Sequence, residues 1–101
     1  MNKFKKNSIM ITGASGFIGD NLMRSYRDER QSVIGVDLKS NADDILEADL
    51  SNPEKLKAPM KHCDVIIHTA AMVSNAMSDE EMWTTNVLNT SKLIKLAIVC
   101  R

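Results

Sequence analysis

Three glycines, each three residues after the last, restrict this chain more than any other feature of its sequence. Gly13, Gly16 and Gly19 follow a short apolar run at residues 8–14 and precede residues 17–30, where apolar side chains recur at helical spacing. A glycine turn between a strand and a helix suits a bound phosphate, because the backbone comes close to the anion and the first helical amides face it. The pattern predicts a dinucleotide site, and a ligand-free glycine turn is the alternative.

The rest of the chain alternates short apolar runs with helical segments. We expect strands at residues 32–37, 45–50 and 64–71, a short helix from residue 51 that ends near Pro59, and a long helix that follows the Ser78-x-x-Glu81 capping pattern to residue 101. The order β-α-β-β-α-β-α predicts an α/β fold, with a Rossmann-like parallel sheet and helices on both faces. Residues 1–101 are expected to form one domain.

Asp37 is a second candidate for the same site. It ends the second predicted strand roughly 20 residues after Gly19, where dinucleotide folds place an acid that accepts hydrogen bonds from the adenosine ribose. A carboxylate there repels a 2′-phosphate, so NAD is favoured over NADP. Lys39 lies two residues later and could neutralise a 2′-phosphate, so NADP remains an alternative cofactor. The alternative interpretation of Asp37 is a solvated aspartate at the strand end that binds no ligand.

Composition and charge exclude several classes of function. The chain has 13 basic and 13 acidic side chains, so it lacks the positive charge that nucleic-acid binding needs. No apolar run is long enough for a signal peptide or a membrane span. Cys63 and Cys100 form no disulfide framework, which favours reduced thiols and a cytoplasmic location. Strand alternation places Cys63 opposite His62, Asp64 and His68, so no metal site is predicted.

The long helix has one broad apolar stripe at 100° per residue. We expect the buried stripe to contain Met82, Trp83, Val87, Leu93, Ile94, Ala97 and Ile98, with Asn86 and Thr90 in its middle. A buried amide needs a partner, so Asn86 is expected to contact either a ligand or the backbone. Thr90 is expected to return its hydroxyl to the carbonyl four residues earlier. Leu88, Leu96 and Val99 fall on the opposite face, among lysines.

The motif Thr12-Gly13-x-x-Gly16-x-x-Gly19 resembles that of the extended short-chain dehydrogenase/reductases, the NAD-dependent epimerase/dehydratase family. Three further landmarks follow in order along the whole chain. Asp49-Leu50 resembles the family's adenine-contacting pair, and His68-Thr-Ala-Ala71 its His-x-Ala-Ala strand end. Asn86-Val-Leu-Asn-Thr90 resembles Asn-Val-x-Gly-Thr, with Asn89 where the family usually has glycine.

The resemblance implies a cofactor site in this N-terminal half, with NAD as the cofactor and NADP less favoured. The implied cofactor-binding residues are Gly13, Gly16, Phe17, Ile18 and Gly19 at the pyrophosphate, Asp37 at the ribose, Asp49 and Leu50 at the adenine, and Ala70, Ala71 and Asn86 along the rest.

The family's catalytic Ser or Thr and its Tyr-x-x-x-Lys pair have no counterpart in these 101 residues, and the sole tyrosine, Tyr26, falls in the first helix. We therefore expect the NAD-binding portion of a nucleotide-sugar epimerase/dehydratase-type oxidoreductase, truncated after the fourth strand and its following helix. It would contain no catalytic residue, and only a full-length parent would bind a nucleotide sugar. A non-catalytic dinucleotide sensor or partner-binding module is the alternative, and the coding sequence after the Arg101 codon would distinguish the two.

One edge of the predicted sheet lies next to residues 64–71 and has no further strand to pair with. An open apolar edge invites pairing with another chain. The second apolar face of the long helix could contact another subunit as well. We expect a homo-oligomer or other self-association.

Overall fold

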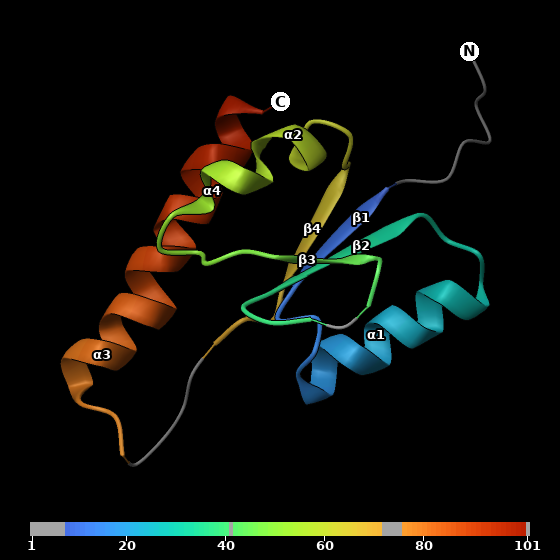
Figure 1. Cartoon of the computed structure of the whole chain (residues 1–101). Helices are drawn as coiled ribbons and strands as arrows, with labels where there is room; N and C mark the ends of the chain where they lie inside the picture. Colours follow the sequence, from blue (N-terminus) through green and yellow to red (C-terminus); the bar gives the residue numbers. More distant parts are fainter. Residues whose placement is uncertain (1–7, 41, 72–75, 101) are drawn as a thin grey trace.

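Four parallel strands form a single sheet in the computed structural model, which describes residues 8–40, 42–71 and 76–100 (Figure 1). The strands are β1 (Ile9–Thr12), β2 (Val33–Asp37), β3 (Ile45–Glu47) and β4 (Val65–His68). They lie in the order β3-β2-β1-β4. This order and the parallel pairing confirm the predicted Rossmann-like sheet.

Each strand is shorter than its apolar run. The third stops at Glu47 rather than residue 50, and the fourth at His68 rather than residue 71. Hydrogen bonds keep the segments beyond attached to the sheet. The Ala48 amide donates to the Asp37 carbonyl at 2.9 Å, and the Thr69 amide donates to the Thr12 carbonyl at 3.2 Å. The chain therefore leaves the ladder at the carboxyl ends of the strands, where a ligand site forms in open α/β sheets.

Helices cover both faces of the sheet, as predicted (Figure 1). On one face α1 (Phe17–Asp28) places Met23 against Ile9 and Ile11 of β1. The other face is covered by α2 (Lys57–Met60) and α4 (Asn89–Val99), and its core cluster consists of Met10, Val36, Leu56, Met60, Leu93 and Leu96. Because neighbouring strand residues point to opposite faces, Ile9 and Met10 belong to different layers of the core.

The short helix begins and ends close to the predicted residues. Pro53 opens a 3-10 turn, η1 (Pro53–Leu56), which continues directly into α2. Pro59 lies inside α2, and the helix ends one residue later at Met60.

The long helix begins at the predicted cap. The Ser78 hydroxyl oxygen accepts a hydrogen bond from the Glu81 amide at 3.1 Å and starts α3 (Asp79–Trp83). A π turn, η2 (Thr84–Leu88), joins α3 to α4. In η2 the Asn89 amide bonds the Thr84 carbonyl five residues back, so this turn is wider than an α turn.

The predicted buried stripe of this helix is wrong in part. Leu93 is buried as expected, but Leu96 is buried as well, whereas Trp83 is 58% exposed and Ile98 is 56% exposed. Apolar side chains occur nearly all round this helix, so periodicity alone did not select the face that meets the sheet. Contact with Met10, Leu56 and Met60 selects it instead.

Candidate functional site

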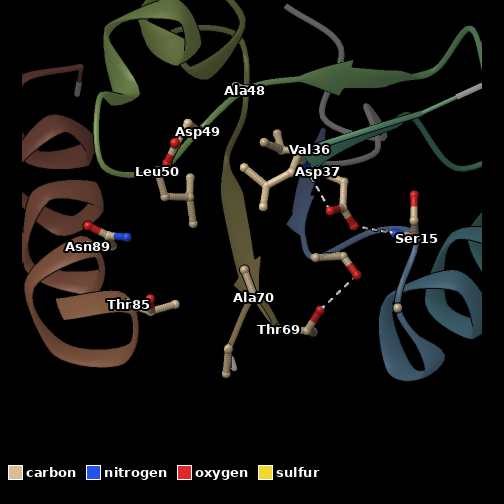
Figure 2. A pocket seen from close by; sticks show the side chains of 14 residues that line it. Ser15, Val36, Asp37, Ala48, Asp49, Leu50, Thr69, Ala70, Thr85 and Asn89 are labelled. Atoms are coloured by element: carbon tan, nitrogen blue, oxygen red, sulfur yellow. Dashed lines mark hydrogen bonds between the residues drawn. The ribbon is translucent and has the colours of Figure 1, made fainter. Parts of the chain in front are cut away.

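A cavity of about 430 Å³ opens at the carboxyl ends of the strands (Figure 2). Its walls come from the loop between β1 and α1, from the ends of β2 and β4, from the segment after β3, and from the helix that contains η2 and α4. The lining residues are Gly13, Ser15, Gly16, Val36, Asp37, Leu38, Ala48, Asp49, Leu50, Thr69, Ala70, Ala71, Thr85 and Asn89. The volume is in the range of small-molecule and cofactor sites.

Two of the three glycines are required by the fold itself. Gly13 has a φ of +68°, and a Cβ on it would lie 2.8 Å from the Ala70 amide nitrogen. A Cβ on Gly19 would overlap the Gly13 carbonyl oxygen. Gly19 therefore allows α1 to pack closely on the end of β1, which is the packing that the motif predicts.

Gly16 differs from the other two because only one atom lies close to its missing Cβ. It is the N-cap residue of α1 and has extended backbone angles. The nearest atom to a Cβ on Gly16 is the Gly13 carbonyl oxygen, at 3.3 Å. The space above Gly16 is therefore open to the cavity, next to the first-turn amides of α1, which have no partner inside the helix.

Phe17 and Ile18 begin α1 with side chains that are 86% and 63% exposed. Neither they nor Gly19 line the cavity. Any contact that Phe17 and Ile18 make with an anion beside Gly16 would use their backbone amides, and that contact stays a prediction.

Asp37 connects the glycine loop to the end of β2 (Figure 2). One carboxylate oxygen accepts a hydrogen bond from the Ser15 amide at 2.8 Å, and the other accepts one from the Leu38 amide at 2.7 Å. Each carboxylate oxygen has a further lone pair, so Asp37 retains the capacity to accept hydrogen bonds from ligand hydroxyls.

The segment after β3 forms the opposite end of the cavity. The Asp49 carboxylate accepts a hydrogen bond from the Ser51 amide at 2.9 Å. That backbone bond is the largest cause that lowers the Asp49 pKa, so the group is ionised at neutral pH. Val36, Ala48 and Leu50 add apolar side chains to the lining of the cavity. This end of the cavity is a slot with apolar walls, and the Asp49 carboxylate at its edge can accept hydrogen bonds.

The end of β4 is fixed to β1 by side-chain hydrogen bonds. The Thr69 hydroxyl donates to the Thr12 carbonyl at 2.6 Å, and the Ala70 amide donates to the Thr12 hydroxyl oxygen at 3.3 Å. Ala70 and Ala71 both line the cavity, and their contact with a cofactor stays a prediction. Their side chains are single methyl groups, so they occupy little of the cavity.

His68 lies behind this wall and joins β1 to α4. Its Nδ1 is 2.6 Å from the Thr12 hydroxyl, and its Nε2 is 2.9 Å from the Thr90 hydroxyl. The Thr90 hydroxyl donates to the Asn86 carbonyl at 2.8 Å, as predicted, so it must accept from Nε2–H. Nε2 of His68 therefore carries a proton, and Nδ1 accepts a hydrogen bond from the Thr12 hydroxyl when the ring is neutral. Burial lowers the pKa of His68, consistent with the neutral ring.

The helix wall is formed by Thr85 and Asn89 rather than by Asn86. Asn86 is half-buried and does not line the cavity, so its contact with a ligand stays a prediction. The sequence reasoning did not place Asn89 in the site, although its replacement of the family's glycine was a signal. Other lining residues that it missed are Ser15, Val36, Leu38, Ala48, Thr69 and Thr85.

In residues 8–40, 42–71 and 76–100, no three His, Cys, Asp or Glu side chains are grouped so that they could hold a metal ion. No helix in that part of the chain has the length and apolar character needed to cross a membrane.

Known proteins resemble the chain over nearly its whole length. The sequence profile of the NAD dependent epimerase/dehydratase family matches residues 9–101. A 4-hydroxy-2-methyl-3-oxo-4-farnesyl-3,4-dihydroquinoline-1-oxide ketoreductase of Stigmatella aurantiaca is 32% identical over 95 residues, which cover 86% of this chain and 28% of that protein. UDP-glucose 4-epimerase of Vibrio cholerae is 29% identical over 98 residues, which cover 89% of this chain and 30% of the epimerase.

Among solved structures, MoeE5 in complex with UDP-glucuronic acid and NAD matches with a TM-score of 0.81 and 26% identity, over 92% of this chain and 33% of that one. This chain thus spans less than a third of the length of the two curated relatives above.

Proposed function

The chain belongs to the NAD dependent epimerase/dehydratase family, and we propose that its cavity binds the adenosine and pyrophosphate portion of NAD. The pyrophosphate would lie over Gly16 at the start of α1, the ribose beside Asp37, and the adenine in the slot near Asp49 and Leu50. NAD supplies hydride transfer when it is bound. The residues of this chain hold and orient it.

The open space at Gly16 is the observation that supports this proposal most directly. A glycine that only the fold needed would show close contacts around its missing Cβ, as Gly13 and Gly19 do. Gly16 has a single neighbour at 3.3 Å and faces the cavity beside unpaired helical amides. A phosphate group fits that position because it needs both the space and the donors.

Gly16→Val tests the pyrophosphate position. The added methyl groups would occupy the space that the phosphates need, so we expect affinity for NAD to fall by about 100-fold or more. Helix content by circular dichroism should stay close to that of the wild type, because only the Gly13 carbonyl oxygen, at 3.3 Å, lies close to the new Cβ. A folded variant that binds NAD as tightly as the wild type would show that the glycine turn is merely structural.

We further propose that NAD binds more tightly than NADP, because Asp37 accepts hydrogen bonds from free ribose hydroxyls and repels a 2′-phosphate. Calorimetric titration with both dinucleotides measures the preference. Asp37→Asn keeps an oxygen that can accept the hydrogen bond from the Ser15 amide but removes the negative charge. It should therefore reduce the ratio of NAD affinity to NADP affinity. Equal affinities in the wild type would point to Lys39 instead.

Within a whole enzyme, we propose that this portion serves an oxidoreductase that acts on a nucleotide sugar. The family and the UDP-sugar ligands of MoeE5 support that substrate class. The 101 residues alone should show no turnover. Tyr26 lies in the last turns of α1, away from the glycine loop. Both ring nitrogens of His68 are engaged by threonines. Measurable epimerase or dehydratase activity from the purified chain would contradict this.

A partner-binding or self-associating module is a second candidate, favoured by exposed apolar surface. Among the described strands β4 pairs only with β1, so its other edge is open, and Val65 on it is exposed. Ile94, Ile98 and Val99 are exposed on α4. We propose that the chain self-associates through these surfaces. Analytical ultracentrifugation should detect a species larger than one chain, whereas a stable monomer would refute this candidate.

We also propose a cytoplasmic location, for a reason of thiol chemistry. Cys63 and Cys100 are both free thiols, and Cys63 packs against the core on the α2 and α4 side of the sheet. Burial raises the pKa of the Cys63 thiol, which keeps it protonated and unreactive. Free thiols of this kind suit a reducing compartment.

A further inference from the structure

Asn89 has a buried polar atom that the fold does not satisfy. It is the first residue of α4, it is 8% exposed, and it lines the cavity. Within residues 8–40, 42–71 and 76–100, its Oδ1 is the one buried side-chain nitrogen or oxygen that has no hydrogen-bond partner. Buried polar atoms in proteins nearly always have partners, so an orphan that borders a cavity indicates a partner that the cavity admits.

The position of the carboxamide suits a ligand contact. Figure 2 shows the Asn89 side chain extending from α4 toward Leu50, with its nitrogen on the cavity side. It lies at the same end of the cavity as Asp49, across the apolar lining of Val36 and Ala48. A flat ring between these apolar walls would present its polar edge to the carboxamide.

The π turn explains why this residue reaches the cavity. The Asn89 amide bonds the Thr84 carbonyl five residues back, so η2 is one residue wider than an α turn. Thr85, within that turn, and Asn89, just after it, are the two helix residues that line the cavity. π turns inside helices occur frequently at functional sites.

We propose that Asn89 selects adenine in this cavity, an inference that rests on the proposed binding of NAD. The carboxamide turns about its soft terminal torsion on binding. Oδ1 then accepts a hydrogen bond from the exocyclic amino group of adenine, and Nδ2 donates to the neighbouring ring nitrogen. A carboxamide is the side-chain group that pairs in this way with the amino group and N7 of adenine.

The amino group of adenine is what this pairing recognises. Hypoxanthine has an oxygen in place of that group, so its C6 substituent and N7 are both acceptors. Oδ1 would then stay unpaired, and only the amide nitrogen would find a partner. The chain should therefore prefer NAD over nicotinamide hypoxanthine dinucleotide.

The test compares these two dinucleotides by calorimetric titration in the wild type and in Asn89→Leu. Leucine has nearly the size and shape of asparagine but forms no hydrogen bond. We expect the wild type to bind the hypoxanthine analogue about 10-fold more weakly than NAD. Asn89→Leu should lower that preference by about 10-fold, chiefly through weaker binding of NAD. Lys95→Ala, on the same helix but exposed and outside the cavity, should leave the preference unchanged.

Thermal unfolding without ligand provides a second measurement. Asn89→Leu removes the unpaired oxygen and buries an apolar group in its place, so the Tm of the free chain should rise. A variant that is more stable but less selective is expected of a ligand contact. A lower Tm with equal weakening of both dinucleotides would show that Asn89 supports the helix, and would overturn the inference.

The remaining outcomes separate this inference from the proposed function. If Asn89→Leu binds both dinucleotides with the wild-type ratio, NAD binding stands and the role of Asn89 is refuted. If the wild type binds neither dinucleotide, the proposed function fails and the inference fails with it.

Discussion

The two walls of the cavity are built by different means. The glycine-loop wall is made of backbone, and its shape follows from a φ of +68° at Gly13 and from the close packing of Gly19 on the end of β1. The helix wall is made of side chains, and what it presents depends on how the helix is rotated about its axis. A rotation by one residue would replace Asn89 with Leu88 or Thr90.

This difference explains which sequence signals were reliable. A glycine that no other residue can replace leaves a mark in the sequence that does not depend on distant contacts. The rotation of a helix with apolar residues on every side leaves no such mark. Motifs of backbone geometry are therefore more informative at this site than periodicity is.

A substitution that disrupts the glycine-loop wall should have the largest effect on the free energy of unfolding. Gly19→Ala is expected to destabilise the chain by about 3 kcal/mol or more, because the new Cβ overlaps the Gly13 carbonyl. Helix propensity alone would favour alanine by about 1 kcal/mol, so any loss must come from this contact. Urea unfolding measures the change, with Gly16→Ala as the comparison that should lose less stability, because its Cβ would meet one atom at 3.3 Å rather than overlap the backbone. Equal midpoints for the two variants would contradict the packing role of Gly19.

The rotation of α4 can be tested by truncating neighbouring residues. Leu93→Ala should cost about 2 to 5 kcal/mol, because Leu93 is 3% exposed within the core. Ile94→Ala should cost less than about 1 kcal/mol, because Ile94 is exposed. Chemical denaturation of both variants measures the difference. Similar losses at the two positions would mean that the helix presents a different face, or that another chain covers Ile94.

The smallest expected effect is on the pH dependence of stability and concerns His68, whose ring is hydrogen-bonded to Thr12 of β1 and Thr90 of α4. Its pKa is lower in the folded chain than the ordinary value of 6.5, so the unfolded chain binds the proton more readily. The stability that neutral His68 contributes is present above pH 6.5 and is lost as pH falls from there through its folded-state pKa. Urea unfolding at pH 7.5 and pH 5.5 should show this loss. His68→Gln does not titrate and should lose less stability than the wild type between the two pH values. His62 is present in both proteins, so the difference between them belongs to His68. An identical pH dependence in the two would contradict the buried neutral histidine.

The parallel sheet and the helices on both faces could be predicted from the sequence, because they follow from the alternation of short apolar runs and helical segments. Of the predicted site residues, Gly13, Gly16, Asp37, Asp49, Leu50, Ala70 and Ala71 line the cavity. These residues lie in the glycine loop or at the ends of parallel strands, and that topology brings strand ends together at one edge.

The residues that the sequence did not place depend on packing between distant segments. Val36 and Ala48 line the cavity because β2 and β3 pair in a particular register and the chain leaves the sheet after Glu47. Thr85 and Asn89 line it because a π turn precedes α4 and the core accepts Leu93 and Leu96. Neither the strand register nor the π turn has a local sequence signal as strong as the glycine motif.

The sequence by itself determined the glycine turn, the acid at the end of β2 and the α/β order, since each depends on backbone conformations and side-chain periods set by neighbouring residues. Only the tertiary structure decided which face of the long helix is buried, and with it that Asn89 rather than Asn86 borders the cavity. The physical reason is that the sheet face around Met10 accepts one set of apolar side chains from a helix that offers several. That choice is made by contacts between segments far apart in the chain.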